Sequence, residues 1–399
     1  MKTLVLNAGS SSHKAALFDF AKGQTALWRS QLDWTHQAGS VELTAQTADG
    51  RRHQAVLATE DKTTGLRWML DTLVEGPVQV LSALSEIEAV GHRVVHGGRD
   101  YQQSTPITPA VKATIQQLFP LAPSHNPANL QGIEAMEAIL TTVPQVAVFD
   151  TAFHAQMPAA ASTYPGPYEW VEQGIQRYGF HGISHRYVAH RTAELMHREL
   201  SDLKLITCHL GNGCSLSAIR DGISVDTTMG FTPLDGLMMG SRSGSVDPGI
   251  LFYLMRHDHC TPDELDTLLN KAAGLKGISG LSNDLRQVLE AAEQGSDRAQ
   301  LAFDMFIHIL RRQIGAMLGT LGGLDALVLT AGIGENSAAV WQAACQNWEF
   351  LGLQLDPAKL QRSSTDQDVA AAESKVRVYV IHTQEEWAIA QDCLKILGA

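Results

Sequence analysis

The chain has 399 residues, of which 44% are hydrophobic and 18% charged, and its formal net charge is -12. This composition is that of an ordinary globular protein, and the length exceeds the roughly 250–300 residues at which a single core stops growing, which favours two domains. The acidic excess argues against a nucleic-acid-binding surface.

The cysteines indicate the redox environment. Cys208, Cys214, Cys260, Cys345 and Cys393 are odd in number and form no C-x-x-C pair, so neither a disulfide framework nor a zinc site is indicated. Reduced thiols in a cytoplasmic protein are the simplest interpretation. We see no signal-peptide pattern and no apolar stretch near the ~20 residues that span a bilayer, so we expect no membrane partner.

The first elements in chain order are two short strands joined by a polar turn. Apolar runs at residues 4–6 and 15–18 flank a turn that offers a glycine, three serine hydroxyls, an amide and a lysine. These groups suit a phosphate, although the G-x-x-x-x-G-K-[ST] spacing of a P-loop is absent. An ordinary serine-rich hairpin is the alternative interpretation.

The remaining apolar patterns predict an α/β architecture. A second strand–turn–strand pattern at residues 206–219 places Gly213 about half the chain length after Gly9, which indicates two similar halves. Further strands are expected at 89–95, 145–149, 326–329 and 376–381, and helices at 192–200, 285–292 and 299–318. Polar clusters follow the strands, and ligands of open sheets bind at that edge, so we expect these clusters to converge on one cleft.

Two charged residues at predicted strands each have more than one possible role. Asp150 follows a strand, where it could hold Mg2+ or orient a nucleophile, or simply cap a helix. Arg93 lies inside an apolar strand, so it must have a fixed anionic partner, either a structural carboxylate or a ligand. Gly97 and Gly98 just beyond it allow a close approach to the backbone.

His181 and His185 lie in a glycine-flanked turn. Gly179 and Gly182 make a helix unexpected there, so a metal site with i, i+4 spacing is disfavoured. A histidine that donates a hydrogen bond to a reacting phosphoryl oxygen fits better, and a structural imidazole is the alternative, particularly for His185.

Two glycine-rich segments complete the pattern. Residues 228–249 form the longest irregular stretch and carry five glycines and one cation, Arg242, as expected of an anion clamp. Residues 327–337 read as a strand entering a glycine turn and then a helix, where backbone N–H groups favour phosphate or a nucleotide.

Taken together, these segments resemble the acetate kinase family. The matching stretches occur in order along the whole chain, at residues 4–14, 91–98, 121–127 in part, 148–158, 178–185, 207–215, 228–248, 280–286, 330–337 and 383–390. The resemblance implies an α/β fold of two domains of duplicated actin-like (ribonuclease H-like) topology around a nucleotide cleft. The implied domains are residues 1–151, with a helix at 386–399 packing back on them, and residues 152–385.

The resemblance also implies the activity: Mg2+-dependent, reversible, in-line transfer of the γ-phosphoryl group of ATP to acetate by a homodimer, with Mn2+ as a possible substitute. Asp150, His181, Arg242 and Arg93 would be catalytic, and Arg93, Val95, Leu121 and Pro233 would bind the carboxylate. Asn7 and Glu385 would place the metal. The nucleotide would be bound by Lys14, His209, Asn212, Gly213, Asp284, Arg286, Gly332, Ile333, Gly334 and Asn336.

Two alternative functions and two departures from the family pattern stay open. The acceptor could be propionate, because one methylene changes binding by only about 1–3 kcal/mol. A non-catalytic nucleotide sensor of the same fold is the other class, although it would not need an acceptor clamp. His13 stands where the family usually has an aliphatic residue, and Ser124 stands where an apolar residue is common. Ser124 puts strict acetate preference in doubt.

Overall fold

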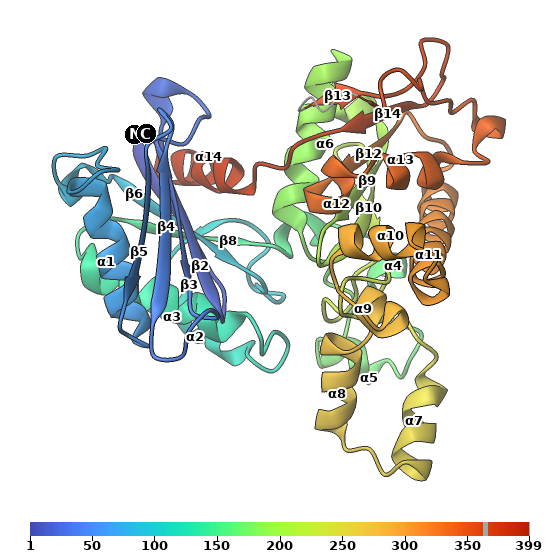
Figure 1. The fold of residues 1–399 in the computed structure, drawn as a ribbon, viewed down its shortest axis with the longest axis horizontal. Helices are drawn as coiled ribbons and strands as arrows, with labels where there is room; N and C mark the ends of the chain where they lie inside the picture. The colour runs from blue at the N-terminus through green and yellow to red at the C-terminus, as the bar shows by residue number, and fades with distance from the viewer. Residues whose placement is uncertain (362–365, 399) are drawn as a thin grey trace. The chain divides into compact units, whose positions relative to one another are not determined.

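The computed structural model describes residues 1–361 and 366–398, and it separates into two compact units. Unit 1 comprises Met1–Ala152 and Gln384–Ala399, and unit 2 comprises Phe153–Thr383. Each unit is built on one sheet with helices on both faces (Figure 1).

Unit 1 contains an eight-stranded sheet in the order β5-β4-β3-β2-β1-β6-β8-β7. Strands β1 to β5 form an antiparallel meander, and β6 and β8 continue the sheet in parallel with β1. Its elements are β1 (Lys2–Ala8), β2 (Ser12–Asp19), η1 (Phe20–Lys22), β3 (Trp28–Asp33), β4 (Val41–Thr47), β5 (Arg52–Leu57), α1 (Lys62–Val74), η2 (Leu84–Glu86), β6 (Ala89–Val94), β7 (Thr105–Pro106), α2 (Pro109–Gln117), α3 (Asn126–Ile139), β8 (Gln145–Phe149) and α14 (Glu385–Leu397).

Unit 2 contains a six-stranded sheet in the order β11-β10-β9-β12-β14-β13. Helix α6 contacts β9 and β12, and α11 contacts β9, β10 and β11. The elements, after η3 (Ala152–His154), are α4 (Ala159–Ser162), α5 (Glu169–Glu172), α6 (Gly182–Met196), η4 (Leu200–Asp202), β9 (Lys204–Leu210), β10 (Cys214–Arg220), β11 (Ile223–Thr227), α7 (Pro248–His257), α8 (Pro262–Lys271), α9 (Gly274–Ser279), α10 (Leu285–Glu293), α11 (Asp297–Leu321), β12 (Ala326–Thr330), α12 (Ala331–Asn336), α13 (Ala338–Cys345), η5 (Glu349–Leu351), β13 (Gln367–Asp368) and β14 (Arg377–Val380).

The two sheets have the same topology, which confirms the predicted duplicated α/β fold. The order β3-β2-β1-β6-β8-β7 in unit 1 is matched by β11-β10-β9-β12-β14-β13 in unit 2, with the same parallel and antiparallel pairings. The opening hairpins correspond, with loops at residues 9–11 and 211–213. Gly9 is therefore equivalent to Gly211, and the expectation that it matches Gly213 is wrong by two residues.

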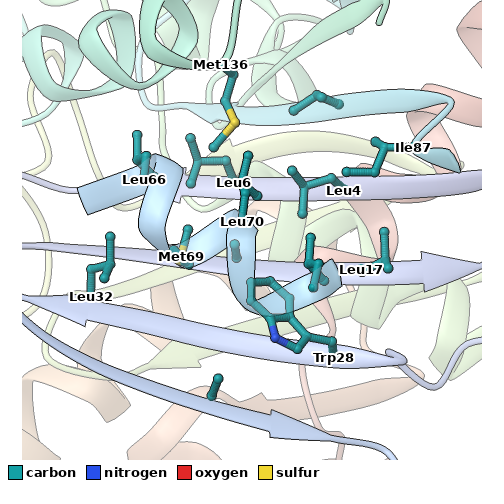
Figure 2. Close-up of a cluster of buried hydrophobic side chains, with 14 of the residues drawn as sticks. Leu4, Leu6, Leu17, Trp28, Leu32, Leu66, Met69, Leu70, Ile87 and Met136 are labelled. Carbon is teal, nitrogen blue, oxygen red and sulfur yellow. The ribbon is translucent and has the colours of Figure 1, made fainter. Parts of the chain in front are cut away.

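The core of unit 1 follows from alternation along its strands. Leu4, Leu6 and Leu17 point to one face of the sheet, where Met69 and Met136 reach them from α1 and α3 (Figure 2). The opposite face of β1 and β6 is covered by α14, shown in red in Figure 1. Gly91 permits that contact, because a Cβ there would lie 2.5 Å from the Ile389 side chain.

One predicted helix is displaced. The expected helix at 192–200 is instead α6, Gly182–Met196, so the glycines that argued against a helix lie at its start. His181 occupies the N-cap position in the left-handed region, with φ of 56°, and Gly179 has φ of 75°. The chain thus turns sharply before the helix and not within it. None of the helices in the described ranges combines the length and apolarity needed to cross a membrane.

Several histidines are buried as neutral side chains. Burial lowers the pKa of His92, His96 and His154 to about 4. His13 is fully buried with its ring edge against Trp34, and burial, followed by the charge of Lys62, lowers its pKa to about 4. The Gly9 backbone is near the imidazole, but neither ring nitrogen makes a hydrogen bond of normal geometry to a described residue.

These pKa values predict that stability falls with acidification. Each folded-state pKa lies below the ordinary value of 6.5, so the unfolded chain binds more protons between pH 6.5 and 4, and stability rises with pH through that window. We expect His13→Leu to remove about 2 kcal/mol of the loss between pH 7 and pH 5. Urea unfolding of both proteins at the two pH values measures this, and parallel losses would contradict it.

Candidate active site

The predicted functional residues fall into two groups, one in each unit. In unit 1, Asn7, Arg93 and Asp150 lie at the carboxyl ends of β1, β6 and β8, and in unit 2, Asn212 and Gly332 follow β9 and β12. Several other predicted residues of unit 2 come from segments outside these strand ends. Because β1, β6 and β8 run parallel, as do β9, β12 and β14, their ends bring polar residues together at one edge of each sheet.

A buried ion pair organises the group in unit 1. Arg93 Nε donates to Asp150 Oδ1 at 3.1 Å, and Nη2 donates to Oδ2 at 2.6 Å. The side chains are 19% and 1% exposed. Burial alone would lower the pKa of the Arg93 guanidinium, but the charges of Asp150 and Glu385 raise it above its ordinary value. The partner left open by the sequence is therefore a carboxylate of the protein.

Asn7 and Glu385 lie beside this pair. Arg93 Nη1 donates weakly to Asn7 Oδ1 at 3.5 Å, and Glu385 is close enough to raise the Arg93 pKa. The described residues contain no cluster of three His, Cys, Asp or Glu that could hold a metal. Mg2+ does not need one, because it is usually bound by one or two carboxylates together with water and substrate phosphates. The amide and carboxylate oxygens present fit that ion.

The segment after β6 is held by amide side chains. Asn129 Oδ1 accepts from the Val95 N–H at 3.1 Å, and Asn126 Oδ1 accepts from the His96 N–H at 3.1 Å. Val95 is buried and Leu121 half-buried, both in unit 1, whereas Pro233 belongs to unit 2. The close approach expected at Gly97 is made by protein, because a Cβ there would lie 2.9 Å from the Phe149 ring.

A histidine network lies under the second hairpin in unit 2. His181 Nδ1 is 2.9 Å and His185 Nε2 is 2.8 Å from the Ser215 hydroxyl, and the His181 ring stacks on His209 at 4.1 Å between centroids. Burial lowers the pKa of His185 well below its ordinary value. His185 is thus a structural imidazole that fixes Ser215, and Ser215 in turn orients His181.

The glycine-rich segment brings Arg242 to the same hairpin. An ideal Cβ on Gly213 would lie 3.4 Å from the His181 ring and 3.6 Å from Arg242 Nη1, so these three residues are neighbours. Arg242 Nη1 donates to the Pro233 carbonyl at 3.0 Å, which fixes the guanidinium. Burial lowers the pKa of this group below its ordinary value.

A pocket of about 700 Å³ lies between the hairpin and helices α10 and α12. Its described lining is Gly211, Asn212, Asn283, Asp284, Leu285, Arg286, Leu289, Gly332, Ile333, Asn336 and Ser337. This volume is typical of a small-molecule or cofactor site. Arg286 pairs with Asp284 through Nε–Oδ1 at 3.0 Å and Nη2–Oδ2 at 2.6 Å, leaving much of the guanidinium in solvent.

Six of the ten predicted nucleotide residues line this pocket, and four do not. His209 and Gly213 lie next to it in the hairpin, and Gly334 is buried in α12, where its carbonyl accepts from Trp341. Lys14 belongs to unit 1, where it is exposed on β2.

The sequence reasoning did not single out Asn283 and Leu289. Asn283 Nδ2 donates to Asn212 Oδ1 at 3.0 Å, and a Cβ on Gly240 would come within 2.2 Å of the same oxygen. The serine–asparagine–aspartate run before α10 was the available signal, since such residues cap helices and bind ligands.

Comparisons with known proteins agree with one another over the whole chain. Residues 2–391 match the acetokinase family. An acetate kinase of Rippkaea orientalis is 58% identical, covering 98% of each chain. The crystal structure of Porphyromonas gingivalis acetate kinase aligns with a TM-score of 0.93 at 39% identity, covering 99% of each chain. A propionate kinase from Francisella tularensis aligns with a TM-score of 0.91 at 37% identity, also covering 99% of each chain.

Proposed function

The chain belongs to the acetokinase family and is a phosphotransferase with a carboxyl group as acceptor, and we propose that it reversibly converts acetate and ATP into acetyl phosphate and ADP. A carboxylate oxygen would form a bond to the γ-phosphorus as the bond to the β,γ-bridging oxygen breaks and ADP leaves. The observation that carries this proposal is the presence of an arginine–aspartate pair in unit 1 and a histidine–arginine pair beside a nucleotide-sized pocket in unit 2.

In unit 1, we assign carboxylate binding to Arg93 and orientation of the reactants to Asp150. Acetate is already ionised near pH 7, so no general base is required to activate it. Asp150 is fixed by two hydrogen bonds to Arg93 and is suited to orienting the guanidinium and the metal. Val95 and Leu121 are our candidates in this unit for apolar contact with the acyl group.

In unit 2, we assign stabilisation of the transferring phosphoryl group to His181 and Arg242. Phosphoryl transfer depends on positioning and on positive charge around the equatorial oxygens more than on covalent chemistry. Both side chains are held by protein contacts before substrate binds, at Ser215 and Pro233 respectively. The pocket beside them would bind the nucleotide, with Gly332 and Ile333 at the adenosine.

We propose Mg2+ as the required ion, with Mn2+ as a possible substitute. Asn7 and Glu385 would hold it, with Asp150 nearby, and the ion would neutralise charge on the phosphate oxygens. Bound in this way, it would supplement the positive charge of Arg93 in unit 1. We also propose a cytoplasmic location, which the five free thiols support.

The acceptor is tested by measuring acyl phosphate as its hydroxamate for carboxylates of two to four carbons. We expect kcat/KM for acetate to exceed that for propionate, by up to about 100-fold, because a small apolar pocket rejects an added methylene by about 1–3 kcal/mol. A preference for propionate would instead support the alternative acceptor, for which the Francisella tularensis propionate kinase is a structural precedent.

The two arginines are tested by replacement. We expect Arg93→Ala and Arg242→Ala each to lower kcat by about 100-fold or more, because each removes a fixed positive charge. Since Arg93→Ala also removes the cation that pairs with the buried Asp150, at a cost of about 3–5 kcal/mol of stability, the control is Arg377→Ala. Arg377 is 22% exposed, close to the 19% of Arg93, and it pairs with Asp368, which is 26% exposed and not among the residues assigned to either site. The Arg377→Ala variant should lose stability and keep its kcat. Near-normal turnover of both Arg93→Ala and Arg242→Ala would refute the role assigned to the two arginines.

We further propose a homodimer that uses helix α7. None of its ten residues is buried. Its large apolar side chains are therefore in solvent, and Ile250, Phe252 and Tyr253 are 49%, 57% and 58% exposed. Adjacent exposed apolar side chains of this size are typical of an interface between chains. Figure 1 shows α7 at the end of unit 2 away from its sheet.

Sedimentation velocity tests this interface. We expect the wild type to sediment as a dimer and Phe252→Glu combined with Tyr253→Glu to sediment as a monomer, because two buried charges would be unpaired at the contact. Val56→Glu, at a 62% exposed position in unit 1, is the matched control and should stay dimeric. A dimer that survives the double substitution would exclude α7 as the interface.

A further inference from the structure

A second groove in unit 2 has no role in the proposed reaction. It encloses about 730 Å³ between α11 and the segment that joins α13 to η5. None of its lining residues lines the nucleotide pocket described above. Helix α13 separates the two, since its N-cap Ser337 borders the nucleotide pocket and Ala343, near its C-terminus, borders the groove.

Three basic side chains of α11 line one wall of the groove. His308, Arg311 and Arg312 are three and four residues apart, so they share a face of the helix. Within residues 1–361 and 366–398, none of these side chains has an ion-pair or hydrogen-bond partner, and the Nε of Arg311 is buried from solvent. Asp304, the acidic residue of the described lining, already accepts a hydrogen bond from Gln300 at 2.9 Å.

Aromatic rings form the opposite wall. Trp348 and Phe350 lie 5.8 Å apart between ring centroids, and Phe350 is 75% exposed. The indole is fixed, because its N–H donates to the Ala344 carbonyl at 2.9 Å and its ring lies against Gly315 of α11. A rigid, half-buried indole beside an exposed phenyl ring provides a stacking surface for a planar group.

Two amides complete the wall. Gln346 and Asn347 are exposed, and their side chains make no hydrogen bond to the described residues. Asn347 is held in the left-handed region, with φ of 64°, which is uncommon for a residue other than glycine. Free amides next to a stacking surface can read the donor and acceptor edge of a base.

From this combination we infer that the groove is a second binding site for a nucleoside phosphate. The base would stack on Trp348 and Phe350, and its edge would meet the two amides. The phosphates would meet Arg311 and Arg312, whose planar guanidinium groups bind phosphate oxygens in pairs. The volume falls in the range of small-molecule sites, which a single nucleotide can fill.

The experiment is calorimetric titration of the full-length protein with ADP in the absence of carboxylate. We expect two binding events per chain, one at each site. Arg311→Ala combined with Arg312→Ala, and separately Phe350→Ala, should weaken the second event by about 10-fold or more, because they remove the phosphate and stacking contacts. Lys271→Ala, which removes an exposed cation on α8, is the matched control and should change neither event.

Fluorescence gives an independent readout that does not depend on activity. ADP bound at the groove should quench Trp348, and the quench should be missing in Trp348→Phe. The kcat of all these variants should stay near wild type, which separates a failure here from a failure of the proposed reaction. Arg311→Lys keeps the charge and tests the site if the double alanine variant does not fold.

The inference is overturned by a single binding event per chain, or by a second event that the groove variants leave unchanged. It is also overturned if inorganic phosphate displaces ADP from the second site at equal concentration, because the site would then recognise an anion and not a nucleoside.

Discussion

The buried pair of Arg93 and Asp150 is the interaction on which the candidate site of unit 1 depends. Neither charge could be buried alone, because an unpaired ion in a protein interior costs several kcal/mol. The pairing is possible because β6 and β8 are adjacent and parallel, and the Val94 carbonyl accepts from the Asp150 N–H. Arg93 and Asp150 therefore lie at the same edge of the sheet. The topology of the sheet thereby sets the position of a guanidinium to within hydrogen-bond geometry. Asn7 and Glu385 gather around this pair, from β1 and the start of α14.

The duplicated hairpin shows how one topology serves two tasks. In both units a three-residue loop joins two antiparallel strands, and the first residue of the loop is a glycine whose N–H bonds back across the turn. The loop at 9–11 continues with serines beside a lysine-bearing strand, whereas the loop at 211–213 continues with Asn212 and Gly213. His181 and Arg242 lie beside Gly213 of the second hairpin, at 3.4 and 3.6 Å from an ideal Cβ at that position. The difference in chemistry therefore arises from two or three residues on a common backbone.

The sequence predicts the strands that are short apolar runs ending in a polar cluster, and the strand at 145–149 is an example in which every residue is buried. It does not predict β3, β4 and β5, because more and less buried residues alternate along them and leave no apolar run. It predicts the start of α6 poorly, since the stop signal of Gly182 is overridden by the packing of Ile183, Ser184 and His185. The partner of Arg93 could not be chosen from the sequence, because Asp150 is 57 residues away and only the parallel pairing brings it near. The run before α10 marks Asn283 as a polar residue, but its contact with Asn212 joins segments 71 residues apart and could not be read from the sequence.

The cations of this acidic protein are held in two different ways, and the difference bears on what they can do. Arg93 is fixed by a carboxylate and Arg242 by the Pro233 carbonyl, so their geometry is set before any ligand binds. Catalysis benefits from such preorganisation, because no reorganisation is needed as charge develops. Arg311 and Arg312 have no such restraint among the described residues, so a ligand must order them and their binding is weakened by the lost side-chain entropy. Cations fixed by the protein suit a reaction. Cations that a ligand must order suit a site that binds its ligand weakly and is filled according to the ligand concentration.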